Sequence, residues 1–141
     1  MDTRLYREQH ASIARLARRL EEESRSVSTP RGVTQVLATL ESFTTELVEH
    51  LAMEDGELYP AMMASDDPVL SELAQRYFAE MGGITDLFGL YRSRWNAASI
   101  TADPLRFTRE TKLLIDGLFD RIRRENETLY PAAETVEAIA A

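Results

Sequence analysis

A segment that occurs twice places the strongest constraint on how this chain can fold. The first copy reads EHLAMEDGELYPA, and the second reads DRIRRENETLYPA, 71 positions further along. Glu54 in the first copy aligns with Glu125 in the second, and in each copy the sequence Leu-Tyr-Pro begins four residues after the glutamate. The repeat predicts that the chain is built from a duplicated helical hairpin.

The two copies differ in their histidines. The chain has only two, His10 and His50, and both lie in its first half. The offset that aligns the two glutamates places His50 on Arg121 and His10 on Met81. The pattern therefore predicts a set of ligands that is present in one half and has been dismantled in the other.

Apolar residues recur at intervals of three and four along the chain, which is typical of amphipathic helices, and no stretch alternates convincingly as a strand would. We expect four helices, over residues 3–23, 32–63, 68–95 and from 104 to about Pro131, which could end or bend the last one. Four such helices joined by short loops favour an all-α, up-down-up-down four-helix bundle, with a single domain covering residues 1–141. Gly82 and Gly83, inside the third helix, predict a kink or a close backbone approach there.

The composition excludes several classes of protein. No apolar run approaches the roughly 20 residues that would span a bilayer, and the first residues do not resemble a secretory signal, so we expect a cytoplasmic protein. The absence of cysteine excludes disulfides and thiolate metal sites. A net charge of −8 argues against nucleic acid as a partner, because such binding depends on neutralising phosphates.

Basic charge is nevertheless concentrated in the first helix. The arginines that share its outer face are Arg4, Arg7, Arg15, Arg18 and Arg19. They form either a solvated face balanced by nearby glutamates or a docking face for an acidic protein partner.

Several polar side chains fall on the inward stripes of the expected helices. These are His10, His50, Glu54, Arg121 and Glu125. Glutamate and arginine are rarely buried unless they are paired or coordinate a metal. His50 and Glu54 are four residues apart, so they lie one above the other on one helix face. Two imidazoles and two carboxylates that converge in a bundle core would suit a divalent ion such as iron, zinc or manganese.

These motifs resemble the hemerythrin-like (HHE cation-binding) family of four-helix bundles, which hold a non-haem di-iron centre. The resemblance rests on the early histidine in REQHASIARL, on His50 and Glu54 ahead of the first Leu-Tyr-Pro, and on Glu125 ahead of the second. It covers almost the whole chain.

Members of that family typically have further histidines on the third helix and at the start of the fourth-helix motif. This chain has Met81 and Arg121 there. The resemblance therefore implies a degenerate member with a half-site, in which His10, His50, Glu54 and Glu125 bind at most one metal. Met81 and Arg121 would lie beside these ligands, and the arginine would neutralise the carboxylates.

Three functions follow as alternatives. The first is a non-enzymatic protein that senses or handles iron, oxygen or a related small diatomic molecule through the reduced metal site. The second is a metal-free regulatory or interaction module, which would use the basic face of the first helix or an exposed surface around Trp95. The third is a redox enzyme, which needs an open metal position and a substrate channel that the sequence does not show. Phosphate-binding loops and nucleophile elbows are absent from the sequence.

Overall fold

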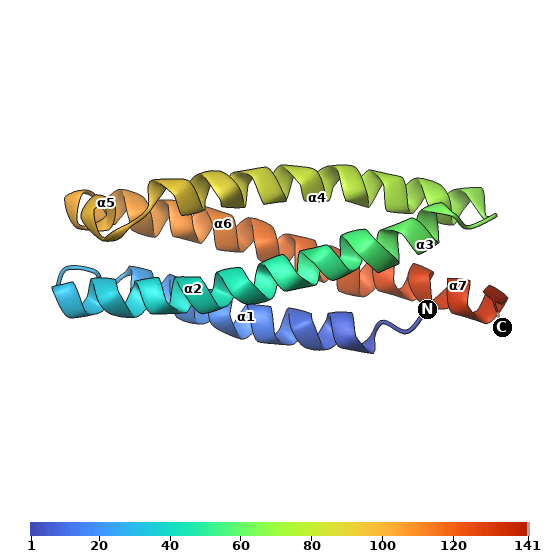
Figure 1. Ribbon diagram of the computed structural model, residues 1–141, viewed down its shortest axis with the longest axis horizontal. Coiled ribbons are helices and arrows are strands. Elements are labelled where there is room, and N and C mark those ends of the chain that lie inside the picture. Colours follow the sequence, from blue (N-terminus) through green and yellow to red (C-terminus); the bar gives the residue numbers. More distant parts are fainter. Residues whose placement is uncertain (141) are drawn as a thin grey trace.

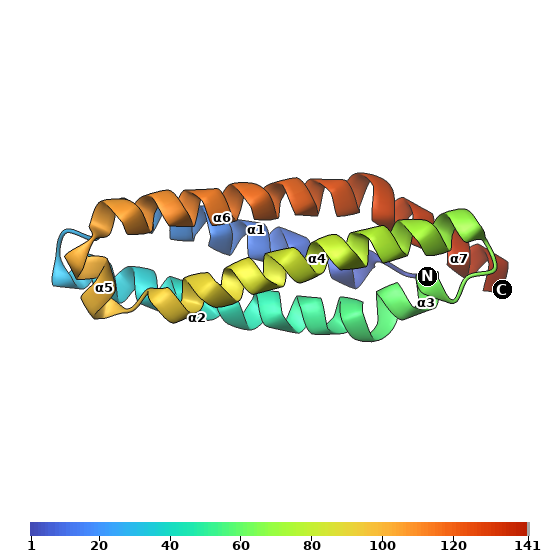
Figure 2. The same cartoon turned by 90° about the horizontal axis from the view of Figure 1, so that it is seen from above.

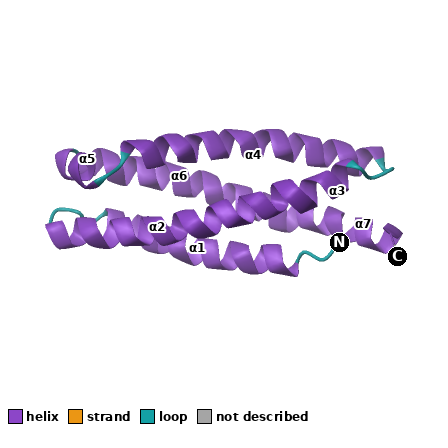
Figure 3. Cartoon of the chain, viewed as in Figure 1, coloured by secondary structure: helices purple, strands orange, loops and turns teal. Residues whose placement is uncertain are grey.

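The computed structural model describes residues 1–140, apart from the side chains at positions 81, 82 and 136–140. Over these residues the chain is built from helices and short loops, without strands (Figure 3). The elements in chain order are α1 (Arg4–Ser24), α2 (Pro30–Met53), η1 (Glu54–Leu58), α3 (Tyr59–Met63), α4 (Pro68–Arg94), α5 (Ala97–Ala102), α6 (Pro104–Arg124), η2 (Glu125–Leu129) and α7 (Tyr130–Ala140).

These elements form four long rods that pack side by side (Figure 1). α1 is the first rod, and α2, η1 and α3 run on as the second. α4 is the third rod, and α6, η2 and α7 form the fourth. Successive rods run in opposite directions, and the two ends of the chain lie at the same end of the bundle (Figures 1 and 2). The predicted all-α, up-down-up-down bundle is confirmed.

Caps and prolines explain where the rods begin. Thr29, Asp67 and Asp103 each accept a hydrogen bond from a backbone N–H in the first turn of the helix that follows, and a proline occupies the first position of each of these helices. Such caps accept hydrogen bonds from backbone N–H groups that the first turn of a helix leaves unpaired. Proline suits the first position because it has no backbone N–H that would need a partner there. The second rod therefore begins at Pro30, two residues before the expected start.

The expected loop between the third and fourth rods contains a short helix, α5. Asn96 and Ser99 form a capping box at its start, and Ile100 is fully buried. Trp95, just before it, is only 4% exposed, and its indole N–H donates a hydrogen bond to Glu110 across 2.7 Å. The Trp95 ring itself therefore packs into the bundle core, whereas Leu90 and Leu113, which line a surface groove together with Arg94 and Glu110, are exposed.

Each copy of the repeat contains a π-helical turn, η1 in the second rod and η2 in the fourth. The backbone N–H of Tyr59 donates to the carbonyl of Glu54, and that of Tyr130 donates to the carbonyl of Glu125. These bonds span five residues where an α-helix spans four, and such turns occur frequently at functional sites. Pro131 is the second residue of α7, so the rod continues through this proline.

The core is formed by two apolar clusters along the bundle. One runs from the α5 end and includes Phe43 and Ile13, and the other lies near the chain ends and includes Tyr6 and Tyr130. On α1, His10 lies between Tyr6 of one cluster and Ile13 of the other. The buried polar residues therefore occupy the layer where the two clusters meet.

Two further expectations concern the surface and α4. α4 passes through Gly82 and Gly83 as one uninterrupted α-helix, and a Cβ atom at Gly83 would meet no atom within 4 Å, so the expected close approach does not occur there. On α1, Arg19 pairs with Glu23 at 2.8 Å and Arg7 pairs with Glu134 at 3.2 Å, as a solvated face would. Among the described residues, no helix combines the length and apolar character needed to cross a membrane.

Candidate metal centre

The structure brings four of the polar residues singled out in the sequence into one buried layer. They are His10 on α1, His50 on α2, Glu54 at the start of η1 and Glu125 at the start of η2. Each is at most 2% exposed. One potential ligand atom from each side chain lies within 4.8 Å of the corresponding atoms of the others.

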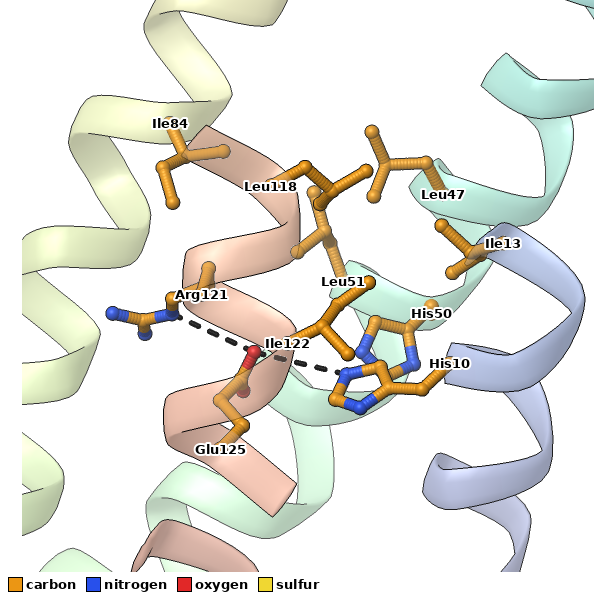
Figure 4. Close-up of a pocket in the computed structure, with 10 residues that line it drawn as sticks. All are labelled: His10, Ile13, Leu47, His50, Leu51, Ile84, Leu118, Arg121, Ile122 and Glu125. Atoms are coloured by element: carbon orange, nitrogen blue, oxygen red, sulfur yellow. Dashed lines mark ion pairs between the residues drawn. The ribbon is translucent and has the colours of Figure 1, made fainter. Parts of the chain in front are cut away.

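The ligand atoms face one another in pairs. His50 Nε2 lies 3.1 Å from Glu54 Oε1, and His10 Nε2 lies 3.7 Å from Glu125 Oε1. The two imidazole rings lie next to each other, with their centres 4.6 Å apart (Figure 4). The arrangement places two ring nitrogens and two carboxylates around a common point.

Two side-chain amides hold the imidazoles in place. His10 Nδ1 lies 2.9 Å from Asn126 Oδ1, and His50 Nδ1 lies 2.7 Å from Gln9 Oε1. Because an amide oxygen can only accept, each Nδ1 carries the hydrogen and each Nε2 presents a lone pair to the centre. This is the tautomer of a histidine that binds a metal through Nε2 and donates its other N–H to a fixed partner. The Gln9 amide is itself oriented by a bond from its Nε2 to Met53 Sδ at 3.0 Å.

Sequence reasoning missed both amides. Asn126 lies inside the second π-turn, so the α-helical period used to assign faces does not apply to it. Gln9 is adjacent to His10 but contacts His50 on the neighbouring rod. The only signal in the sequence was that one amide residue lies next to His10 and the other lies next to Glu125.

The tyrosines of the two Leu-Tyr-Pro motifs are exchanged between the halves. Tyr59 follows Glu54 but donates its hydroxyl to Glu125 Oε2 at 3.3 Å. Tyr130 follows Glu125 but donates to Glu54 Oε1 at 2.5 Å, and its oxygen also lies 3.0 Å from His10 Nε2. Both tyrosines are fully buried and bond to the carboxylates directly.

Arg121 occupies the position that aligns with His50 and lies against the same layer. Its Nε is 3.5 Å from Glu125 Oε1. Its terminal nitrogens donate outward, to the Tyr59 hydroxyl at 2.9 Å, the Tyr77 carbonyl at 2.5 Å and Glu80 Oε2 at 3.1 Å. The guanidinium therefore pairs with Glu125 on one side and with the surface residue Glu80 on the other. The side chain of Met81 lies outside the described part of the chain.

Burial sets the protonation of the centre. It lowers the pKa of His10 to about 3, with a further contribution from His50, and it lowers the pKa of His50 to about 4. Both imidazoles are therefore neutral near pH 7, as metal ligands must be. Burial also raises the pKa of Glu54 and, together with the neighbouring Glu54 charge, raises that of Glu125 well above its ordinary value. Positive charge placed between the carboxyl groups would favour their ionised forms.

Three buried polar atoms in this layer lack a hydrogen-bond partner within the described part of the chain. They are His50 Nε2, Glu54 Oε2 and Arg121 Nε. Buried polar atoms are normally satisfied, so such exceptions need an explanation. The first two present lone pairs, and a divalent cation would satisfy both. Two imidazole nitrogens and two carboxylates form a donor set that suits iron, manganese or zinc, so the residues present fit one such ion.

A small cavity of about 10 Å³ adjoins the ligands, with room for one water-sized molecule. His10, His50, Glu125 and Arg121 line its polar side (Figure 4). The remaining lining residues are apolar: Ile13, Leu47, Leu51, Ile84, Leu118 and Ile122. The centre thus opens onto a space that excludes most solvent.

The comparison with family models identifies a family of cation-binding domains. The sequence matches the family model described as the hemerythrin HHE cation binding domain over residues 1–133, a range that includes all four residues of the centre. No curated protein and no solved structure matched the chain. With nearly the whole chain matched by that model, the protein belongs to the hemerythrin HHE cation-binding domain family.

Proposed function

We propose that this protein binds one metal ion per chain through Nε2 of His10 and His50 and through the carboxylates of Glu54 and Glu125. In this proposal the protein is non-enzymatic and senses or handles iron, oxygen or a related small molecule. The observation that carries the proposal is the convergence of four buried ligand atoms within 4.8 Å of one another.

The second half of the chain supports a limit of one ion. The residue that aligns with His50 is Arg121, whose guanidinium is always charged and lies 3.5 Å from Glu125. A second cation on that side would meet this positive charge in a buried, weakly screened environment. Arg121 instead supplies the counter-charge that a second ion would otherwise provide.

A bound ion would supply a Lewis-acidic centre, and iron would add one-electron redox chemistry. Side chains of the protein orient the ligands and exclude water. Asn126 and Gln9 fix the two imidazole tautomers, and the hydroxyls of Tyr59 and Tyr130 hold the carboxylates in position. The apolar lining of the adjoining cavity excludes bulk water, which strengthens electrostatic interactions at the centre.

Elemental analysis of untagged protein purified without chelator tests this proposal. We expect near one metal per chain in the wild type and, because one of four ligands is gone, less than about a tenth of that in His50→Ala. Glu49→Gln, an exposed change next to His50, is the matched control and should keep its metal. Wild-type protein that holds almost none, even after anaerobic addition of Fe(II), would contradict the proposal and leave the metal-free interaction module as the better explanation.

The two amides provide a second test. We expect Asn126→Ala and Gln9→Ala each to weaken metal binding by about 10–100-fold, because groups that orient a ligand histidine typically contribute that much. A chelator competition assay measures the affinity. Gln75→Ala removes an exposed amide on α4 and should leave the affinity unchanged. Unchanged affinity in both of the first two variants would show that the amides do not position the ligands.

A further inference from the structure

The outer surface where α4 and α6 run side by side is apolar along its middle (Figure 2). Leu87 and Leu90 of α4 and Leu113 of α6 are 63%, 61% and 73% exposed. Single exposed leucines are ordinary on a folded protein, but these three line one continuous groove between the two helices. We call this surface the α4/α6 face, and it comprises Gly83, Ile84, Leu87, Leu90, Leu113, Leu114 and Gly117. Apolar groups gathered in this way gain free energy when a partner covers them.

The same face has a glycine on each helix that packing within the chain does not require. A Cβ atom at Gly83 or at Gly117 would meet no atom within 4 Å. Glycine in a helix interior is less favourable than alanine, so a single copy gives no reason for either residue. Without side chains, these positions leave hollows that a neighbouring helix can approach closely. The α4/α6 face therefore combines projecting leucines with hollows of its own.

Two ion pairs across the groove fix which residues of α4 and α6 lie at the same level. They are Arg94 with Glu110, near α5, and Glu80 with Arg124, further along the bundle. On α4, Leu87 lies seven residues from each of its two charged residues, and on α6, Gly117 lies seven residues from each of its two. Leu87 on one helix is therefore level with Gly117 on the other, midway between the ion pairs.

A second copy turned by 180° about an axis along the groove fits this face in shape and in charge. The rotation places α4 of each copy on α6 of the other and keeps every residue at its own level. Leu87 of each copy then meets the hollow at Gly117 of the other. Each charged residue of α4 likewise faces the oppositely charged residue of α6 that it pairs with in its own chain, so opposite charges meet.

A two-fold axis across the helices fits less well. It would place α4 on α4 and α6 on α6, so that Leu87 meets Leu87 and Gly117 meets Gly117. Projections would then face projections, and hollows would face hollows. Shape complementarity therefore selects the axis along the groove, and the contact is the self-complementary one of a symmetric dimer.

The α4/α6 face is large enough for a stable dimer. α4 has 27 residues and α6 has 21, so the two helices present a surface about 30–40 Å long and about 20 Å wide. Such a surface measures on the order of 600–800 Å², close to the roughly 800 Å² that each partner contributes to a standard protein–protein interface.

We propose that the α4/α6 face binds the same face of a second copy of this chain. In the resulting two-fold symmetric dimer, Leu87 of each copy occupies the hollow at Gly117 of the other. The dimer does not depend on metal binding, because none of the four ligand residues belongs to the α4/α6 face.

Sedimentation equilibrium tests the dimer with a variant whose effect is separable from unfolding. We expect wild-type protein at about 100 μM to have twice the monomer mass of 16.0 kDa, because interfaces of this size bind in the micromolar range or tighter. Gly117→Leu fills the hollow and should weaken dimerisation by about thirtyfold or more, the effect of losing a central interface contact. In protein diluted until it is monomeric, the same substitution should leave the unfolding temperature equal or higher, since it removes a glycine from a helix interior.

The matched control is Gly89→Leu. Gly89 is an exposed glycine of α4 where an added Cβ would also meet no atom within 4 Å, but it does not line the groove. This variant should dimerise as the wild type does. Wild-type protein that stays monomeric would overturn the proposal and leave the face to a helix of another protein. A dimer that Gly117→Leu and Gly89→Leu affect to the same extent would overturn it as well.

Disulfide formation tests the packing, because the chain contains no cysteine of its own. Mixed Leu87→Cys and Gly117→Cys chains should form a linked dimer under mild oxidation, since the proposed contact brings these positions together and keeps one native leucine–glycine contact. A mixture of Val48→Cys, which alters a 54% exposed residue of α2, with Gly117→Cys should link at least about tenfold more slowly. Equal rates in the two mixtures, or faster linking of Leu87→Cys to itself, would contradict the proposed packing.

Discussion

Replacing Arg121 with leucine is expected to lower the free energy of unfolding of the metal-free protein by about 3–5 kcal/mol. The substitution leaves Glu125 in the core without its cationic neighbour at 3.5 Å. It also removes the donors that satisfy the Tyr59 hydroxyl and the Tyr77 carbonyl. Urea denaturation followed by circular dichroism, on protein freed of metal with a chelator, measures the difference.

The matched control is Arg124→Leu. Arg124 also pairs with Glu80, but its side chain is 35% exposed, and the loss should stay below about 1 kcal/mol, as for other exposed ion pairs. The double variant Arg121→Leu, Glu125→Leu should recover much of the lost stability, because it removes both buried charges together. Equal losses at positions 121 and 124 would show that Arg121 does not stabilise the buried carboxylate.

The second large effect concerns pH. Between about pH 6 and 4.5, the free energy of unfolding of the metal-free wild type should fall more steeply than that of His50→Gln, by about 1.4 kcal/mol per pH unit. Burial lowers the pKa of His50 to about 4 in the folded protein, compared with an ordinary value of 6.5. The unfolded chain therefore binds the proton first, and the stability that neutral His50 contributes above pH 6.5 is lost as the pH falls toward 4.

The comparison between variants is needed because the carboxyl groups act in the opposite direction. Burial raises the pKa of Glu125, so its contribution is greatest at low pH and is lost as the pH rises through the folded-state pKa. The slope of the wild type alone mixes both effects, whereas the difference between wild type and His50→Gln isolates the histidine. Urea titrations at four pH values measure it, and parallel slopes would mean that His50 is protonated in the folded protein.

The sequence predicted the bundle and the residues of the centre from the helical period, the internal repeat and the family resemblance. Intervals of three and four define the four rods, and the repeat aligns Glu54 with Glu125 at the same depth. His50 and Glu54 share a helix face because they are four residues apart, which is a property of any α-helix. The helix faces depend on the backbone period, which each segment reveals by itself, and the equal depth of the two glutamates follows from comparing the two copies of the repeat.

The sequence did not predict the groups that complete the layer, because their partners lie on other rods. The π-turns shift the faces of Asn126 and the two tyrosines away from those that an unbroken α-helix would give. Gln9 contacts a histidine 41 positions away, a relation that no local period contains. The hydrogen bond from Trp95 to Glu110 is of the same kind, since Glu110 belongs to the next rod.

The exchanged tyrosines mean that neither half of this chain is self-sufficient. A cut in the turn between Met63 and Pro68 would give two hairpins, and each would keep a glutamate whose hydroxyl donor belongs to the other piece. The centre is in this sense an interface between two related hairpins that happen to be joined covalently. Reciprocal contacts of this kind are those of a two-fold symmetric dimer, in which each partner supplies what the other lacks.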